Sequence, residues 1–235
     1  NMSGTSSFDL FGNAQTFASL VGVSGNSIYN SKISTTSSLI VSGGTTTFAG
    51  LITNNTGSGG VLALEVNGAN LTLSGSNTFS GGTTLTAGVL LVGVASNGLV
   101  GSVANSAVGT GTLRFNGGAL SSTGSTARTI NNDIIFTGNA TLGYSTNTGS
   151  LTFGAGGDLG SSTRTLTVNT GTTAEFDGVL SSATSATGLT KAGSGTLILG
   201  GVNTYSGITS VNAGILSISD DQNLGAVPGL LTPAK

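Results

Sequence analysis

The residues of this chain that could do chemistry are few, and its eight Asp and Glu side chains come first. Glu175 and Asp177 lie two apart in a strand-like segment, so they would project to one face. Asp220 and Asp221 lie in an expected turn. Paired carboxylates can hydrolyse glycosides, but such sites normally gather several charged residues from adjacent turns. One expected turn from Glu175 only Asp158 could join, so we expect exposed, solubilising charge and no catalytic residue.

The composition removes most other enzyme chemistry. The chain has no His, Cys or Trp. The absence of His excludes Ser-His-Asp triads and His-ligated zinc or haem. The absence of Cys excludes disulfides, thiolate nucleophiles and iron-sulfur ligands. A formal net charge of −2 with scattered basic residues also argues against nucleic acid or an anionic lipid surface as a partner.

Several local patterns resemble ligand sites but are too sparse to form one. The stretch GAGGDLG from Gly154 is similar to one loop of a calcium-binding β-roll, which needs stacked copies. GSGG around Gly57 and GTGT from Gly109 lack the GK[ST] that completes a phosphate loop. We therefore expect no metal and no cofactor. Matches to N-x-[ST] are frequent by chance in a chain with 70 Ser or Thr, and the basic residues are dispersed. The acceptor matches are Asn54, Asn70 and Asn139, and the basic residues considered are Arg114, Arg128, Arg164 and Lys191.

The elements that position these residues must come from an unusual composition. Gly, Ser, Thr and Asn make up 131 of 235 residues, which is typical of low-complexity chains. Leu, Ile, Val and Phe nevertheless number 62, enough to bury a core. No apolar run approaches the ~20 residues of a membrane-spanning helix, and the longest begins at Val89. We therefore expect a folded protein with no membrane span.

Internal similarity is the strongest signal. LTLSGSNTFSGGTTLTAG from Leu71 and LILGGVNTYSGITSVNAG from Leu197 share 10 of 18 positions at an offset of 126. A weaker pair relates Phe48 to Phe176 at an offset of 128, and a third relates Phe8 to Phe115 at 107. The second half therefore has about 21 more residues between equivalent landmarks than the first, as an inserted structural unit would produce. The sequence predicts a period of about 21 residues, with 126 equal to six turns.

Within each period, short apolar segments alternate at period two and are separated by Gly, Asn, Ser and Thr clusters. This pattern excludes amphipathic helices and favours short strands. We expect an all-β fold: a single right-handed parallel β-helix (β-solenoid) of about 21 residues per turn and roughly 11 turns. It would span 1–235 as two related modules, about 1–107 and 108–235, with repeat cores at 61–92 and 188–218. Loops are expected at 54–60, 121–126 and 181–188.

Inward residues of successive turns should stack. Leu71 and Leu73 would recur as Leu197 and Leu199 because each matches the apolar residues above and below it. Asn77 and Asn203, in the shared N-T-[FY]-S-G turn, should be corner residues that tolerate left-handed backbone angles, with Gly81 and Gly207 allowing positive φ. Aromatic residues should lie inside the coil and form stacks, in preference to an external sugar-binding platform: Phe48, Phe79, Phe153, Phe176 and Tyr205.

The segment from Gly188 to Gly229 resembles the passenger-associated transport repeat of bacterial autotransporters. Its residues GLTKAGSGTLILGGVNTYSGITSVNAGIL follow the family pattern L-x-K-x-G-x-G-x-L-x-L-x-G-x-N-T-Y-x-G-x-T-x-V closely. Leu71 to Val92 carries it more loosely, with Glu65 in the place of Lys191, and FDLFGNAQTFASLVG from Phe8 is similar to the strands that precede such repeats. The resemblance implies a β-helical stem in a secreted or surface protein of a Gram-negative bacterium, but no particular activity.

Three functions remain open at this stage. The first is a non-enzymatic extracellular element, a rigid stem or a self-assembling surface fibre. The second is an adhesin whose lateral face or loops bind a surface glycan or protein. The third, less favoured, is a polysaccharide-degrading enzyme. If a second copy followed Lys235 directly, its Phe8 would follow Phe115 at the same offset that relates Phe48 to Phe176, so head-to-tail self-association is an expected possibility.

Overall fold

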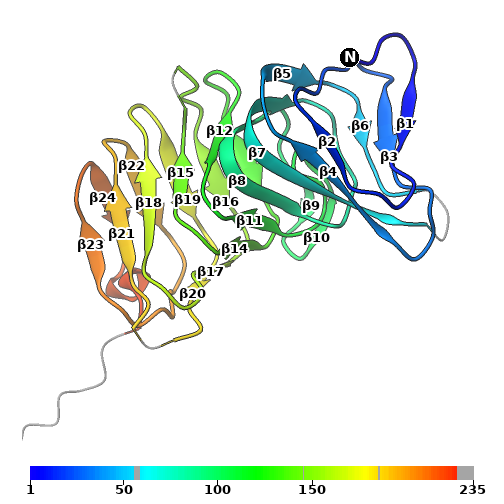
Figure 1. Ribbon diagram of the computed structural model, residues 1–235. Helices are drawn as coiled ribbons and strands as arrows, with labels where there is room; N and C mark the ends of the chain where they lie inside the picture. Colours follow the sequence, from blue (N-terminus) through cyan, green and yellow to red (C-terminus); the bar gives the residue numbers. More distant parts are fainter. Residues whose placement is uncertain (56–58, 145, 185, 227–235) are drawn as a thin grey trace, which may run out of the picture.

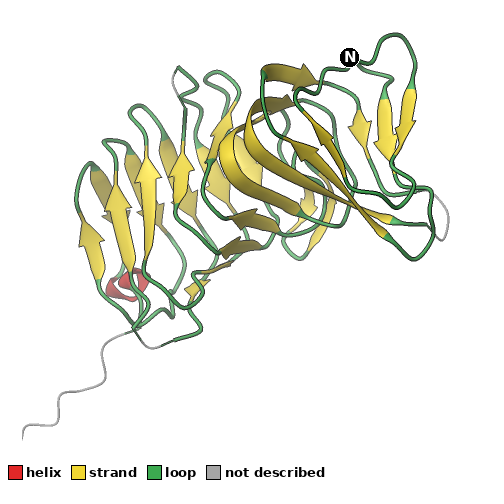
Figure 2. Cartoon of the chain, viewed as in Figure 1, coloured by secondary structure: helices red, strands yellow, loops and turns green. Residues whose placement is uncertain are grey.

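The computed structural model describes residues 1–55, 59–144, 146–184 and 186–226. The chain winds into a parallel β-solenoid of about 9 turns with about 23 residues each, and its strands lie side by side along one axis (Figure 1). Figure 2 shows strands and connecting loops throughout, and one 3-10 helix, η1 (Asp221–Leu224), within the described part of the chain. The all-β parallel solenoid is confirmed. Its turns are slightly fewer and slightly longer than the sequence predicted.

Parallel pairing organises the strands into one large and two smaller sheets, plus one hairpin. The large sheet has 14 strands: β2 (Gln15–Phe17), β4 (Thr36–Val41), β5 (Thr45–Phe48), β7 (Val61–Leu73), β8 (Thr83–Val92), β11 (Leu113–Phe115), β12 (Ala119–Ser122), β14 (Ile134–Phe136), β15 (Ala140–Leu142), β17 (Gly157–Asp158), β18 (Arg164–Val168), β20 (Leu180–Ser181), β21 (Leu189–Ala192) and β23 (Thr209–Val211). The 3-stranded sheet has β1 (Ser7–Asp9), β3 (Ser27–Tyr29) and β6 (Leu51–Ile52), and the 5-stranded sheet has β13 (Arg128–Ile130), β16 (Leu151–Phe153), β19 (Thr173–Phe176), β22 (Thr196–Leu199) and β24 (Ile215–Ile218).

The large sheet covers two faces of the coil. One ladder of pairs runs from the first half of β8 through β11, β14 and β17 to β20, and a second runs from the last part of β8 through β12, β15, β18 and β21 to β23. Strands β7 and β8 are long enough to belong to both ladders, with irregular register between them around Asn67. The third face is the 3-stranded sheet in the N-terminal half and the 5-stranded sheet in the C-terminal half.

Turn length varies along the coil, and one turn carries an insertion. Leu71 pairs with Leu90, whereas Leu85 pairs with Phe115, which is a much longer step along the chain. The long turn contains the antiparallel hairpin of β9 (Asn97–Leu99) and β10 (Ser102–Asn105). A hairpin can be added without disturbing the coil, since its ends return to nearly the same place. The third face changes from one sheet to the other at this turn.

The core follows from alternation along most of the strands. In β7 the residues alternate between buried and half-buried positions on each side of the exposed pair Asn67–Gly68, and Leu62, Leu64, Val66, Leu71 and Leu73 are buried. Because the pairing is parallel and in register, inward side chains of successive turns stack along the axis. The result is one continuous apolar core through the described coil. At roughly 25 cal/mol per Å² of buried apolar surface, this core is the main favourable contribution to folding.

The two repeat copies do not lie on the same face, contrary to the six-turn prediction. The ladder that starts at Leu71 in β7 continues through Leu90, Leu120, Leu142 and Val168, and its sixth strand, five turns further on, is β21. Leu197 lies in the next strand, β22, which belongs to the 5-stranded sheet. The 126 residues between the two copies therefore correspond to five full turns plus one further face of the coil. Each copy keeps its local packing because every face presents the same buried alternation to the core.

The predicted loops are only partly correct. Ser121 and Ser122 are buried in β12, so the loop predicted at 121–126 begins later. The segment between β20 and β21 is a loop, as predicted for 181–188, except that Ser181 ends β20 and residue 185 lies outside the described residues. Residues 56–58 of the loop predicted at 54–60 also lie outside them.

Candidate functional site

The structure does not bring the candidate acids together. Glu175 projects outward from β19, where its cross-strand neighbours are Thr152 and Ile198. Asp177 follows that strand and is exposed. Asp158 lies on β17, beside Ile135 and Ser181, in the other sheet. The grouping of Asp158 with Glu175 and Asp177, which carboxylate chemistry would need and which the sequence did not favour, therefore does not form.

Asp158 and Asp220 have local structural roles. The Asp158 carboxylate accepts a hydrogen bond from the Gly160 N–H at 2.7 Å, which closes the turn of the GAGGDLG stretch. Asp220 is the N-cap of η1, with its carboxylate accepting from the Gln222 N–H and the Asn223 side chain completing a capping box. Within the described ranges, no group of three or more Asp or Glu residues is close enough to hold a metal ion.

The Asn residues of the acceptor pattern use their side chains in contacts within the fold. Asn54 accepts from the Leu62 and Ser80 N–H groups, Asn139 accepts from the Thr165 N–H, and Asn70 donates to the Tyr144 hydroxyl. Two of the arginines also bind backbone carbonyls: Arg128 donates to Val92 and Arg164 to Leu159.

The aromatic residues predicted for the interior are all there. Phe48, Phe79, Phe153, Phe176 and Tyr205 are fully buried. Phe153 and Phe176 stack with ring centroids 4.5 Å apart. Phe176 also packs against Phe136 at 6.2 Å, and Phe136 stacks on Phe115 at 5.3 Å. These side chains belong to the core and are not an external binding platform.

Asn77 and Asn203 are corner residues, as predicted, but for a different reason. Neither has a positive φ. Asn77 instead bridges three turns: its Oδ1 accepts from the Ile52 N–H at 2.8 Å, its Nδ2 donates to the Ala107 carbonyl at 2.8 Å, and its own N–H donates to Ser106. Both residues are buried. A buried polar side chain is stable here because its hydrogen-bonding groups are satisfied.

The second copy repeats the arrangement one face further round. Asn203 Oδ1 accepts from the Leu180 N–H at 2.7 Å, and Asn203 Nδ2 donates to the Asn223 carbonyl. Gly81 and Gly207 of the shared turn do not have positive φ, contrary to the prediction. They are needed for close packing, since a Cβ would lie 2.5 Å from the Leu62 carbonyl oxygen at Gly81 and 2.4 Å from the Thr187 carbonyl carbon at Gly207.

Lys191 is a feature that the sequence did not reveal. It points inward from β21 and is fully buried, whereas from the sequence it was only one of several dispersed basic residues. Its ammonium donates to the carbonyls of Ala192, Gly193 and Ala213 at 2.8, 2.7 and 3.0 Å, which ties two consecutive turns. Pairing shows that Val66, and not Glu65, holds the equivalent position: Val66 pairs with Leu85 as Lys191 pairs with Val211. The sequence did offer one signal for this burial: Lys191 lies two residues after the apolar Leu189, so both side chains point to the same side of the strand.

Burial lowers the pKa of Lys191 below its usual value near 10.5. Between the two values the unfolded chain binds more protons than the folded chain, so the free energy of unfolding should rise with pH in that interval. We expect urea unfolding to show a larger rise from pH 8 to pH 10 for the natural chain than for Lys191→Met. Lys32→Met, at an exposed position, is the matched control and should keep the rise. Equal pH profiles for all three proteins would contradict this.

The fold and these corners define the class of protein: a parallel β-solenoid whose repeated corner is built on a buried Asn. A family model of the passenger-associated-transport-repeat matches residues 67–92 and 189–218. The chain therefore carries two of these repeats, which are repeats of autotransporter passengers, and this family points to a secreted or surface protein. No curated protein and no solved structure matches the chain significantly. Within the described residues there is no helix long and apolar enough to cross a membrane.

Proposed function

We propose that this chain is a rigid, non-enzymatic stem of a Gram-negative surface protein, exposed outside the outer membrane. The observation that supports this best is the large sheet, in which 14 strands run without interruption from the first turns to the last. Each pairing adds backbone hydrogen bonds parallel to the axis, about 4.8 Å apart. About 9 turns therefore give a stiff element roughly 40 Å long.

The buried Asn corners support the same proposal. They join turns that are far apart in sequence, as Asn77 joins Ile52 to Ala107. Bending the coil at a corner would break these bonds in a site that water does not reach, where each loss costs about 1–3 kcal/mol. Stiffness is thus built into the repeat itself.

A surface-labelling experiment tests the proposal. An antibody raised against the purified chain should label intact cells of the source bacterium without permeabilisation, and external protease should remove the label. An antibody against a periplasmic protein is the control for envelope integrity and should not label intact cells. Labelling only after permeabilisation would contradict the proposal. So would release of reducing sugars by the chain if Glu175→Ala or Asp177→Ala abolished it.

A fibre is the second candidate, favoured by the last described turn. Val211, Ile215 and Leu224 are 51%, 59% and 37% exposed. The equivalent residues of the first copy, Leu85, Val89 and Val108, are at most 5% exposed, and β11 and β12 cover the first two of them. A further solenoid turn over this end, from the same polypeptide or from a second molecule, would bury the apolar side chains. Electron microscopy separates the cases: fibres with a repeat of roughly 40 Å indicate self-assembly, and discrete rods indicate a stem.

A further inference from the structure

A groove runs across the outer surface of the 3-stranded sheet. It consists of two adjoining hollows of about 350 and 280 Å³, which share Ser27 of β3 and Leu51 of β6. One hollow extends toward Ser24 and Ser76 and the other toward Tyr29 and Asn55. We call these residues together the β3–β6 groove. It spans three successive turns, so its long direction follows the axis of the coil.

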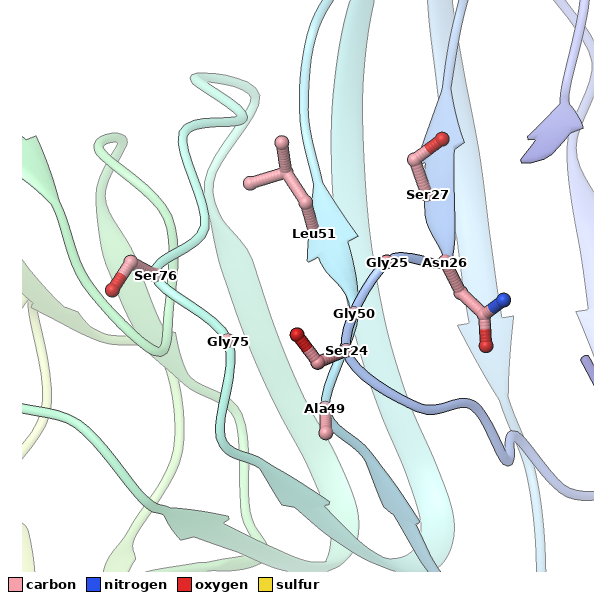
Figure 3. Close-up of a pocket in the computed structure, with 9 residues that line it drawn as sticks. All are labelled: Ser24, Gly25, Asn26, Ser27, Ala49, Gly50, Leu51, Gly75 and Ser76. Carbon is pink, nitrogen blue, oxygen red and sulfur yellow. The ribbon is translucent and has the colours of Figure 1, made fainter. Parts of the chain in front are cut away.

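Glycines in the floor of the groove let consecutive turns approach closely. Gly50 and Gly75 lie where consecutive turns cross closely: a Cβ on Gly75 would lie 1.9 Å from the Gly50 carbonyl oxygen, and one on Gly50 would lie 2.5 Å from that of Asn26. Figure 3 shows Leu51 pointing from β6 into the open space beside the Gly75–Ser76 segment. Leu51 is 39% exposed, which is high for a leucine in a paired strand.

The second module does not repeat the groove. Ile52 and Leu180 are equivalent, since each donates its N–H to the corner Asn of its copy. Ile28 pairs with Ile52 as Gly157 pairs with Leu180, so Asp158 stands where the first module has Tyr29. The aromatic residue is therefore particular to the first module. Core packing does not require it there, because Tyr29 projects outward.

The chemistry of the groove limits what it can bind. None of its lining residues is charged. Among the residues that the structure describes, the hydroxyls of Ser24, Tyr29 and Ser76 have no hydrogen-bond partner, so they can bind a ligand. Tyr29 and Leu51 add apolar surface beside these hydroxyls. Strand addition by a peptide is disfavoured, because β3 is already paired on both sides, with β1 and β6.

A charged residue beside the groove argues against an anionic ligand. Asp9 pairs with Tyr29 and lies beside the groove. Burial acts to raise the pKa of Asp9, but hydrogen bonds from Ser31 and Phe11 outweigh it and lower the pKa, which keeps this carboxylate ionised. A ligand with many hydroxyls, apolar ring faces and no charge matches the hydroxyls, the apolar surface and the uncharged lining of the groove. We propose that the β3–β6 groove binds a neutral, linear oligosaccharide along the axis of the coil.

Isothermal titration of the whole chain with cellohexaose, maltohexaose and chitin hexaose tests this. Because the groove is shallow, we expect at least one hexaose to bind with a Kd of about 1 mM. Tyr29→Ala and Leu51→Ala should each weaken binding about tenfold, since the apolar contact is lost. Matched controls are Tyr144→Ala, a half-exposed tyrosine outside the groove, and Val179→Ala, the equivalent of Leu51 in the second module. Both should bind as the natural chain does.

Folding controls and further ligands show whether any loss of binding comes from the groove itself. Circular dichroism and urea unfolding check that each variant is folded, and a folded Tyr29→Phe variant should keep most of the affinity because it keeps the ring. The proposal would be overturned if none of the three hexaoses bound at a sugar concentration ten times the expected Kd. Equal loss in Tyr29→Ala and Tyr144→Ala would also overturn it, as would tighter binding of a galacturonate hexamer, which would mark an anion site.

Discussion

Asn77→Ala is expected to lower the free energy of unfolding by about 2–6 kcal/mol. The substitution removes the acceptor of the Ile52 N–H and the donor to the Ala107 carbonyl. Both backbone groups would remain buried without a partner, and each such group costs about 1–3 kcal/mol. Urea unfolding followed by far-ultraviolet circular dichroism measures the change.

Two further variants show whether hydrogen bonding is the cause. Asn77→Asp keeps an acceptor for the Ile52 N–H but cannot donate to Ala107 and places a charge in a buried site, so it should also be destabilising. Asn97→Ala, at an exposed position of β9, should change stability by less than about 0.5 kcal/mol. If Asn77→Ala were as stable as Asn97→Ala, the bridging role of the corner Asn would be wrong.

Phe176→Ala is expected to cost about 3–5 kcal/mol. Phe176 is fully buried, stacks on Phe153 and touches Phe136, so its removal leaves a cavity lined by aromatic rings. The surrounding turns cannot close this cavity, because their separation is fixed by backbone pairing with β16 and β22. Thermal and urea unfolding measure the loss of stability.

The size of the side chain should set the size of this effect. Phe176→Leu retains most of the volume and should cost less than about 1.5 kcal/mol. Phe11→Ala removes a ring that is 60% exposed and should cost under about 1 kcal/mol. Comparable destabilisation by Phe11→Ala and Phe176→Ala would show that the interior aromatic cluster does not limit stability.

The repeat copies show how far the sequence could predict the coil. Matching residues such as Leu71 and Leu197 predicted short strands with an inward apolar side, and both are buried. Their offset did not predict the number of turns, because the turns differ in length and the hairpin at Asn97–Asn105 is hidden in one of them. Similarity between copies reports local packing, which every face of the coil shares. It does not report which face a copy occupies.

Single polar residues were harder to place than apolar ones. From the sequence Lys191 was only one of several dispersed basic residues, although it alternates with buried Leu189 and is itself buried. Its partners are backbone carbonyls, one of them on the next turn at Ala213, and a carbonyl has no signature in the sequence. The spacing of the carboxylates was also a poor guide to their position. Glu175 and Asp158 seemed one turn apart, but they lie in different sheets.

The sequence alone determined that this chain is an all-β parallel solenoid, because period-two alternation and recurring Gly-Asn turns depend only on local backbone preference and on the stacking of like residues. The tertiary structure decided everything that depends on register. It placed the repeat copies on different faces, buried Lys191 under neighbouring carbonyls and brought Tyr29, Leu51 and Ser76 from three turns to one groove. Contacts between turns depend on the exact length of each turn, and that length is set by how the whole coil packs.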